Sequence, residues 1–154
     1  MPRLWIAAGL SAATLALASP AAALTVRACD GLTENAQNIV EPWSANSWAF
    51  YQGRVRVAVV DTGGEPACCS SHLLVMFDDP TEEGGVVCRI VSDRGRTGFA
   101  GIDAKSVKAS YDARRGLLFS FGYSVFPQDG DGSRTVTGVG KVRVNLGRRT
   151  VVGE

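Results

Sequence analysis

Apolar and polar residues alternate with a period of two along much of this chain, and this pattern limits the fold more than any other feature. The clearest case lies between residues 53 and 61, where valines alternate with polar side chains. The valines are Val55, Val57 and Val59, and the arginines between and before them are Arg54 and Arg56. Successive side chains of a β-strand point to opposite faces of its sheet, so the segment predicts a strand with one buried face. A parallel α/β sheet, whose strands are apolar on both faces, is not expected.

Five more segments are predicted to form strands. They cover residues 72–77, 86–92, 105–111, 117–126 and 135–146. The segments that connect them are rich in glycine, proline and aspartate, which favour tight turns. Helical periodicity is weak and confined to residues 30–40, with Thr33 as a candidate N-cap. We therefore predict an all-β fold, a single small antiparallel β-sandwich or barrel-like domain with at most one short N-terminal helix.

The beginning of the chain has the composition of a secretory signal peptide. Arg3 is the only charged side chain among residues 1–23, and an apolar stretch follows it. Pro20 interrupts this stretch, and three small alanines then lead to Ala23. This order of features predicts cleavage after Ala23 and export to the periplasm of a bacterium or to the medium. The remaining residues, 24–154, are expected to form a single β-rich domain.

The charge balance argues against a nucleic-acid partner. Residues 24–154 carry equal numbers of basic and acidic side chains, whereas nucleic-acid-binding domains usually carry a basic excess. The charge is nevertheless unevenly distributed, because residues 24–100 are mainly acidic and residues 101–154 mainly basic. Residues 24–154 contain no apolar run long enough to span a bilayer, and no motif in them predicts a cofactor.

The chain has four cysteines, an even number that suits an oxidising compartment. A disulfide between Cys29 and Cys88 is favoured, because it would tie the N-terminal segment to a predicted strand. Cys68 and Cys69 are adjacent, and they could form a vicinal disulfide, stay free, or pair with the other two in a crossed arrangement. A zinc site is not expected, because the chain has no CxxC pair and only one histidine.

That histidine, His72, is the weak candidate for a catalytic residue. Cys69, Ser70 and Ser71 precede it, so a nucleophile with a neighbouring base is conceivable from composition. Adjacent residues of a strand, however, point to opposite faces, and no GxSxG nucleophile elbow is present. The sequence therefore favours a His72 that simply begins a strand, and no catalytic residue is assigned.

An aromatic group after Pro42 is the candidate binding site. Its members are Trp43, Trp48 and Tyr51. If they are exposed, these rings could stack on a sugar or anchor a partner protein. If they are buried, they belong to the core, as large aromatic residues near strands usually do.

Two further groups of charged residues have simpler explanations. Asp129 and Asp131 resemble the start of a calcium loop, but Arg134 and Gly140 occupy positions where an EF-hand loop needs glycine and glutamate. An ordinary turn is favoured. The second group could form a basic face, and it comprises Lys141, Arg143, Arg148 and Arg149, with Arg114 and Arg115. Basic residues that protect an exposed sheet edge are the favoured explanation.

These observations lead to three functional hypotheses. The first is an exported, non-enzymatic binding or accessory domain whose partner is another exported protein or a glycan. The second is a small secreted hydrolase that uses His72. The third is a secreted enzyme inhibitor that presents a rigid loop, with residues 62–71 and 93–104 as the candidate loops.

Overall fold

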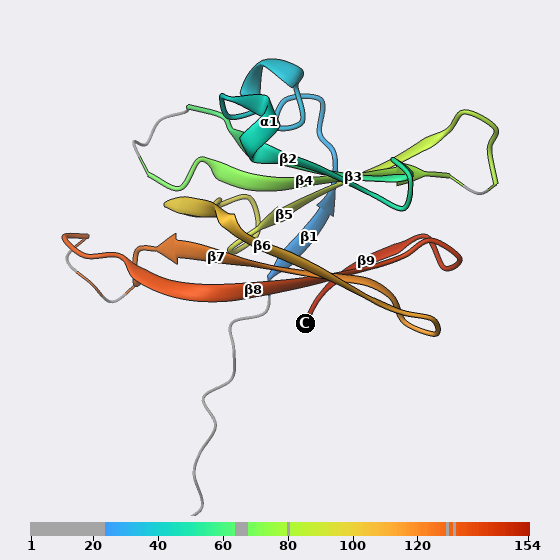
Figure 1. The fold of residues 1–154 in the computed structure, drawn as a ribbon. Coiled ribbons are helices and arrows are strands. Elements are labelled where there is room, and N and C mark those ends of the chain that lie inside the picture. The colour runs from blue at the N-terminus through green and yellow to red at the C-terminus, as the bar shows by residue number, and fades with distance from the viewer. Residues whose placement is uncertain (1–23, 64–67, 80, 129, 131) are drawn as a thin grey trace, which may run out of the picture.

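The computed structural model describes residues 24–63, 68–79, 81–128, 130 and 132–154. The segment predicted to be the signal peptide lies outside these residues. The described chain forms two antiparallel sheets that stack face to face (Figure 1). The predicted all-β fold is therefore confirmed. The part of the chain that the structure describes has no helix long and apolar enough to cross a bilayer.

The first sheet has five strands in the order β1-β5-β4-β3-β2. Their bounds are Thr25–Ala28 for β1, Ser47–Phe50 for β2, Val55–Asp61 for β3, Ser71–Asp78 for β4 and Val86–Ser92 for β5. All neighbouring strands are antiparallel, and β4 lies at the centre. Three of these strands were predicted from the alternation, whereas the four-residue β1 and β2 were not.

The second sheet has four strands in the order β6-β7-β8-β9. Their bounds are Gly101–Asp112 for β6, Gly116–Val125 for β7, Val136–Asn145 for β8 and Thr150–Gly153 for β9. The register of β6 against β7 shifts between Asp103 and Lys108. Because β7 and β8 are the two inner strands, both edges of this sheet are formed by the first and last strands of the meander.

The main core lies between the two sheets. The inward valines of β3 meet the inward aromatic residues of β7, and Phe119 and Phe121 are 1% exposed. Phe119 stacks against Phe50 of β2, and Phe121 packs edge-on against Phe99. Burial of such side chains stabilises the fold by roughly 1.5–3 kcal/mol each. The alternation predicted these inward faces on both sheets.

A smaller core lies on the outer face of the first sheet. Val60, Leu74 and Ile90 are buried there, although they point away from the main core. The segment after β1 covers them, and Ile39 forms a bridge to Val60 of β3. The central strands of this sheet are thus apolar on both faces, while Arg56 of β3 and Arg54 directly before it remain exposed.

The short helical segments differ in position from the prediction. A 3-10 helix spans Ala36–Asn38, and the single described α-helix, α1, spans Trp43–Asn46. Of the weak helix signal over residues 30–40, only the 3-10 helix forms, because side chains at the start of this segment bond to the backbone locally. Asp30 accepts hydrogen bonds from the backbone N–H groups of Leu32 and Thr33, which favours a turn over a helix.

Candidate binding surface

Three tight turns from both sheets meet at one end of the sandwich. They are the β2–β3, β6–β7 and β8–β9 turns, which lie far apart in the sequence. A hollow of about 230 Å³ lies between them. It is lined by Tyr51, Tyr111, Ala113, Arg114, Gly116, Leu117, Val144, Asn145, Leu146 and Gly147.

The β2–β3 turn has a backbone conformation that its residues adopt at a cost. Tyr51 and Gln52 have φ angles of 55° and 57°, and Gly53 donates its N–H to the carbonyl of Phe50. Two central residues with positive φ suit the twist of a hairpin, but asparagine and glycine are the usual occupants. Each other residue costs roughly 1–2 kcal/mol in this region. Tyrosine is therefore held at the tip of this turn against its backbone preference.

The strained turn brings Tyr51 against Tyr111 of β6. Their ring centroids are 5.1 Å apart and their planes cross at 78°, an edge-on arrangement. A hydrogen bond between the two side chains raises the pKa of Tyr51 to about 12. Tyr51 and Tyr111 are 38% and 60% exposed, respectively. The pair therefore joins the two sheets and still presents aromatic surface to solvent.

The β6–β7 turn carries two arginines whose backbone is fixed by Asp112. The carboxylate of Asp112 accepts hydrogen bonds from the N–H groups of Arg114 and Arg115, both at 2.8 Å. These bonds lower the pKa of Asp112. With the backbone fixed, Arg114 lines the hollow beside the tyrosine pair.

A second hollow, of about 460 Å³, adjoins the first on the outer side of the second sheet. It is lined by Arg114, Arg115, Arg143, Asn145, Arg148, Thr150 and Val152. The two hollows share Arg114 and Asn145. We call the residues that line the two hollows the turn surface. Aromatic side chains lie at one end of this surface and arginines at the other.

One carboxylate already lies among these arginines. Glu154 accepts hydrogen bonds from Nε and Nη2 of Arg143, at 2.5 and 2.9 Å, and from Arg115. These bonds lower the pKa of Glu154 and raise that of Arg143. Arg143 is only 8% exposed, so the surrounding residues fix the orientation of its guanidinium group. Arg143 and Arg115 therefore form a site that binds a carboxylate.

Edge protection does not explain the outward basic residues of β8. Lys141 and Arg143 belong to a strand that is hydrogen-bonded to β7 on one side and approached by β9 and Glu154 on the other. Arg149, in the β8–β9 turn, forms an ion pair with Asp79 of the β4–β5 hairpin. Among the described residues, Arg114 and Arg148 form no ion pair.

The structure separates the three aromatic residues of the candidate binding site. Tyr51 lines the smaller hollow, whereas Trp48 of β2 is half-buried and packs against the main core. Trp43 lies on α1 and is 49% exposed. The sequence analysis missed Tyr111, although its position directly before the predicted turn at residues 112–116 marks it as a residue near a hairpin end.

His72 lies in a buried position in β4. It is 4% exposed, and its Nδ1 lies 2.9 Å from the hydroxyl of Ser92, which is fully buried. Burial lowers the pKa of His72 to about 4, so the ring is neutral near pH 7. A substrate cannot reach either side chain in this arrangement. The geometry favours a structural role for the pair.

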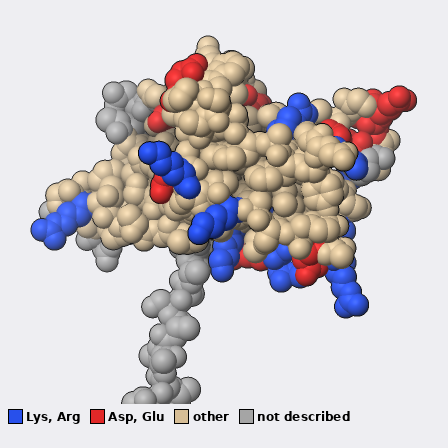
Figure 2. All heavy atoms as spheres, viewed as in Figure 1, with Lys and Arg blue, Asp and Glu red and all other residues tan. Residues whose placement is uncertain are grey.

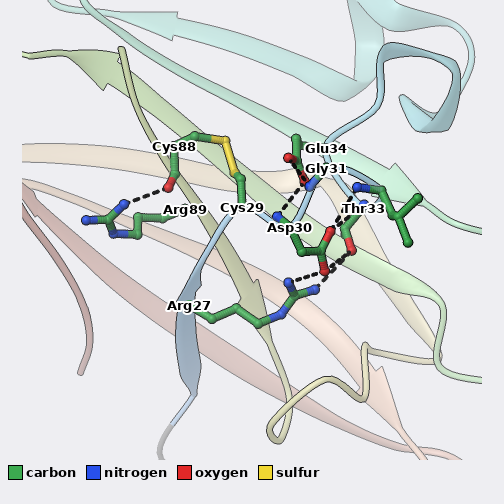
Figure 3. The surroundings of a disulfide bond; sticks show 9 residues. Arg27, Cys29, Asp30, Gly31, Thr33, Glu34, Cys88 and Arg89 are labelled. Carbon is green, nitrogen blue, oxygen red and sulfur yellow. Dashed lines mark hydrogen bonds and ion pairs between the residues drawn. A yellow bond between two sulfur atoms is a disulfide. The ribbon is translucent and has the colours of Figure 1, made fainter. Parts of the chain in front are cut away.

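The four cysteines form two disulfides. Cys29 is joined to Cys88, and Figure 3 shows this bond beside the side chains that fix the segment after β1. Arg27 donates hydrogen bonds to Asp30 and Thr33 there. Cys68 and Cys69 form the vicinal disulfide, which was one of the alternatives left open by the sequence.

The two candidate inhibitory loops lie side by side. Gly98 donates its N–H to the carbonyl of Cys69, and Ser71 and Phe99 exchange two backbone hydrogen bonds. An added Cβ at Gly98 would lie 2.4 Å from the carbonyl oxygen of Ser71, so only glycine permits this approach. Residues 62–71 and 93–104 thus form one joined surface, apart from residues 64–67, which are not described.

The weak candidate metal ligands Asp129 and Asp131 lie outside the described residues. Among the residues that are described, no group of three histidine, cysteine, aspartate or glutamate side chains could hold a metal ion. No protein-family model, no curated protein sequence and no solved structure matches this chain. The geometry of the turn surface is therefore the basis for a functional proposal.

Proposed function

We propose that this protein is an exported, non-enzymatic binding domain that contacts its partner through the turn surface. The partner is another exported protein or a glycan outside the cytoplasm. The sandwich serves as a rigid support, and the three turns present the side chains that make contact. Loops held by a rigid scaffold commonly carry binding residues.

The observation that carries this proposal is the exposed Tyr51–Tyr111 pair on a strained turn. Backbone strain at an exposed position persists only where surrounding contacts enforce it, and such positions gather at functional sites. Nothing in the packing of the main core requires an aromatic ring at the tip of this turn. Tyrosine and arginine are also the residue types that contribute most often to binding energy in protein interfaces.

Export is supported by the N-terminal sequence and by the disulfides. Residues 1–23 have the order of features of a signal peptide, and disulfides persist mainly in oxidising compartments. A direct test is the intact mass of the protein recovered from the periplasm or the medium, after thiol alkylation without a reductant. We expect a chain that begins at Leu24 and carries no label. A labelled chain or one that retains residues 1–23 contradicts this part of the proposal.

The binding role is tested with a double variant, Tyr51→Ala with Tyr111→Ala. The protein and the variant are applied to arrays of exported proteins and of glycans. We expect at least one partner that binds the protein and loses most of its affinity for the variant. Leu32→Ala is the matched control, because Leu32 is 77% exposed and lies outside the turn surface. Binding that responds equally to both changes, or the absence of any binding that depends on the tyrosines, overturns the proposal.

Enzyme inhibition is a second candidate, and the joined loops favour it. The hydrogen bonds between residues 62–71 and 93–104 give these loops a fixed shape, which is what an inhibitor needs in order to bind without loss of conformational entropy. The test is inhibition of a panel of secreted hydrolases by the protein and by Arg96→Ala, a change at an exposed loop position. Inhibition that Arg96→Ala removes would support this candidate over the first.

A further inference from the structure

We infer that the turn surface binds an extended acidic segment of a partner protein, and that the arginines around the larger hollow hold its carboxylates. This inference rests on the proposed function and specifies the chemistry of the partner. It is argued from a carboxylate that the site already holds, from the arginines that remain available, and from the charge of the surrounding face.

The contacts of Glu154 show how the site holds a carboxylate. Arg143 approaches the carboxylate with two N–H groups and Arg115 with a third. Glu154 directly follows β9, and its backbone N–H bonds to the carbonyl of Lys141. An acidic residue on an extended backbone therefore fits among these arginines without distortion of the sheet. The paired N–H groups of arginine match a carboxylate in both geometry and charge.

The same hollow contains further guanidinium groups that could bind a carboxylate. Arg114 and Arg148 line it and are exposed, and neither forms an ion pair with a described residue. The nearby carboxylate of Asp112 is directed at backbone N–H groups of its own turn. Arg149 differs, because Asp79 already neutralises it. The hollow of about 460 Å³ thus combines room for side chains with positive charge that has no partner within the described chain.

The charge extends beyond the hollow along the outer face of the second sheet. Lys141 of β8 and Lys108 of β6 lie in one row across the sheet, with Ser120 of β7 between them. Figure 2 shows Lys and Arg side chains along the underside of the molecule, where β8 and β9 lie in Figure 1. Acidic side chains also lie among them on this underside, and another acidic group lies at the projecting β4–β5 hairpin (Figure 2). A segment with several carboxylates fits this face better than one with a single charge.

The free hydrogen-bonding groups favour a peptide over an acidic saccharide. The amide of Asn145 is engaged at both ends, since it donates to the carbonyl of Arg115 and accepts from the N–H of Arg148. The groups that remain free are mainly the guanidinium groups of Arg114 and Arg148, which match carboxylates in geometry and charge. The tyrosine rings can instead pack against apolar side chains that flank an acidic stretch.

The test measures binding to two synthetic peptides that differ only in charge. One carries glutamate at alternate positions among valines and threonines, and the other carries glutamine at the same positions. The protein, purified after expression of the full chain, is compared with Arg114→Gln combined with Arg148→Gln. Arg56→Gln is the matched control, because Arg56 is an exposed arginine on the other sheet.

We expect the protein to bind the glutamate peptide and to bind the glutamine peptide at least about tenfold more weakly. The double variant should bind the glutamate peptide about tenfold more weakly than the unchanged protein does. Arg56→Gln should leave the affinity unchanged. Equal binding of the two peptides, or an affinity that the double variant retains, overturns the inference. An oligogalacturonate that binds through these arginines when the peptide does not also overturns it, but leaves the proposed function intact. The proposed function itself fails only if no ligand depends on Tyr51 and Tyr111.

Discussion

His72 and Asp30 are two polar residues that the surrounding structure holds in a single state. His72 lies in the covered part of β4 and shares a hydrogen bond with Ser92. Asp30 accepts hydrogen bonds from Arg27 and from two backbone N–H groups in the segment that covers the smaller core. Both residues are therefore expected to contribute to stability, and the contributions can be separated by pH and by substitution.

The stability of the protein should fall as the pH is lowered from 6.5 to 4 because of His72. Burial lowers the pKa of His72 in the folded protein to about 4, whereas the unfolded chain binds a proton near 6.5. The unfolded state therefore binds more protons in this range, and the free energy of unfolding drops by roughly 2 kcal/mol. His72→Asn keeps a polar group near Ser92 without a charge, and urea unfolding at several pH values should show a much smaller drop. An unchanged pH dependence in this variant would contradict the assignment.

Removal of the Asp30 carboxylate should destabilise the fold far more than removal of an exposed one. Asp30→Ala leaves the backbone N–H groups of Leu32 and Thr33 without their acceptor and leaves the guanidinium of Arg27 without its ion pair. We expect a loss of about 2 kcal/mol in the free energy of unfolding. Asp78→Ala is the matched control, because the ion pair of Asp78 with Arg54 is about half exposed, and it should cost less than about 0.5 kcal/mol. Chemical denaturation checks both values, and equal losses would contradict this role of Asp30.

The secondary structure could be predicted where the alternation is long. Six strands follow from it, and the inward faces expected for residues 53–61, 117–126 and 135–146 match the main core. In β5 the main core takes Val87 and Val91, whereas Ile90 belongs to the smaller core. The four-residue strands β1, β2 and β9 are too short to show a period of two. The predicted strand begins only at residue 105, whereas β6 begins at Gly101, because the glycines at 98 and 101 hide the alternation there. The outer face of β4 is buried by the segment after β1, which lies far away in the sequence. A local sequence pattern therefore cannot predict this burial.

The β2–β3 turn offers a direct test of backbone strain. Gln52 has a φ of 57° and does not line either hollow, so Gln52→Gly removes strain without changing the turn surface. We expect the free energy of unfolding to rise by up to about 1 kcal/mol, since glycine adopts positive φ without penalty. Gln37→Gly, in the 3-10 helix, should lower it, because Gln37 has no positive φ to relieve. Thermal unfolding checks both, and a loss of stability in Gln52→Gly would show that the turn is unstrained.

At the level of the whole molecule, the candidate site is a consequence of topology. The tyrosine pair joins a turn of the first sheet to β6 of the second, and the arginines come from two other turns and from β8. In the sequence, Tyr51 and the basic residues are separate candidates. Their proximity depends on how the two sheets stack, which no local pattern predicts. The excess of basic residues in 101–154 is visible in the sequence, and in the structure many of these residues lie on the second sheet and its turns.

The central claim is that the turn surface is where this protein meets its partner. The most direct test is a titration of the isotope-labelled protein with the alternating glutamate peptide, followed by NMR chemical shifts of backbone amides. The account predicts shifts concentrated at residues 51–54, 111–116 and 143–152, which saturate together and weaken as salt is added. Shifts concentrated instead at residues 68–71 and 93–104 would contradict it, whereas shifts that scatter without saturation would overturn only the inference that the partner is an acidic peptide.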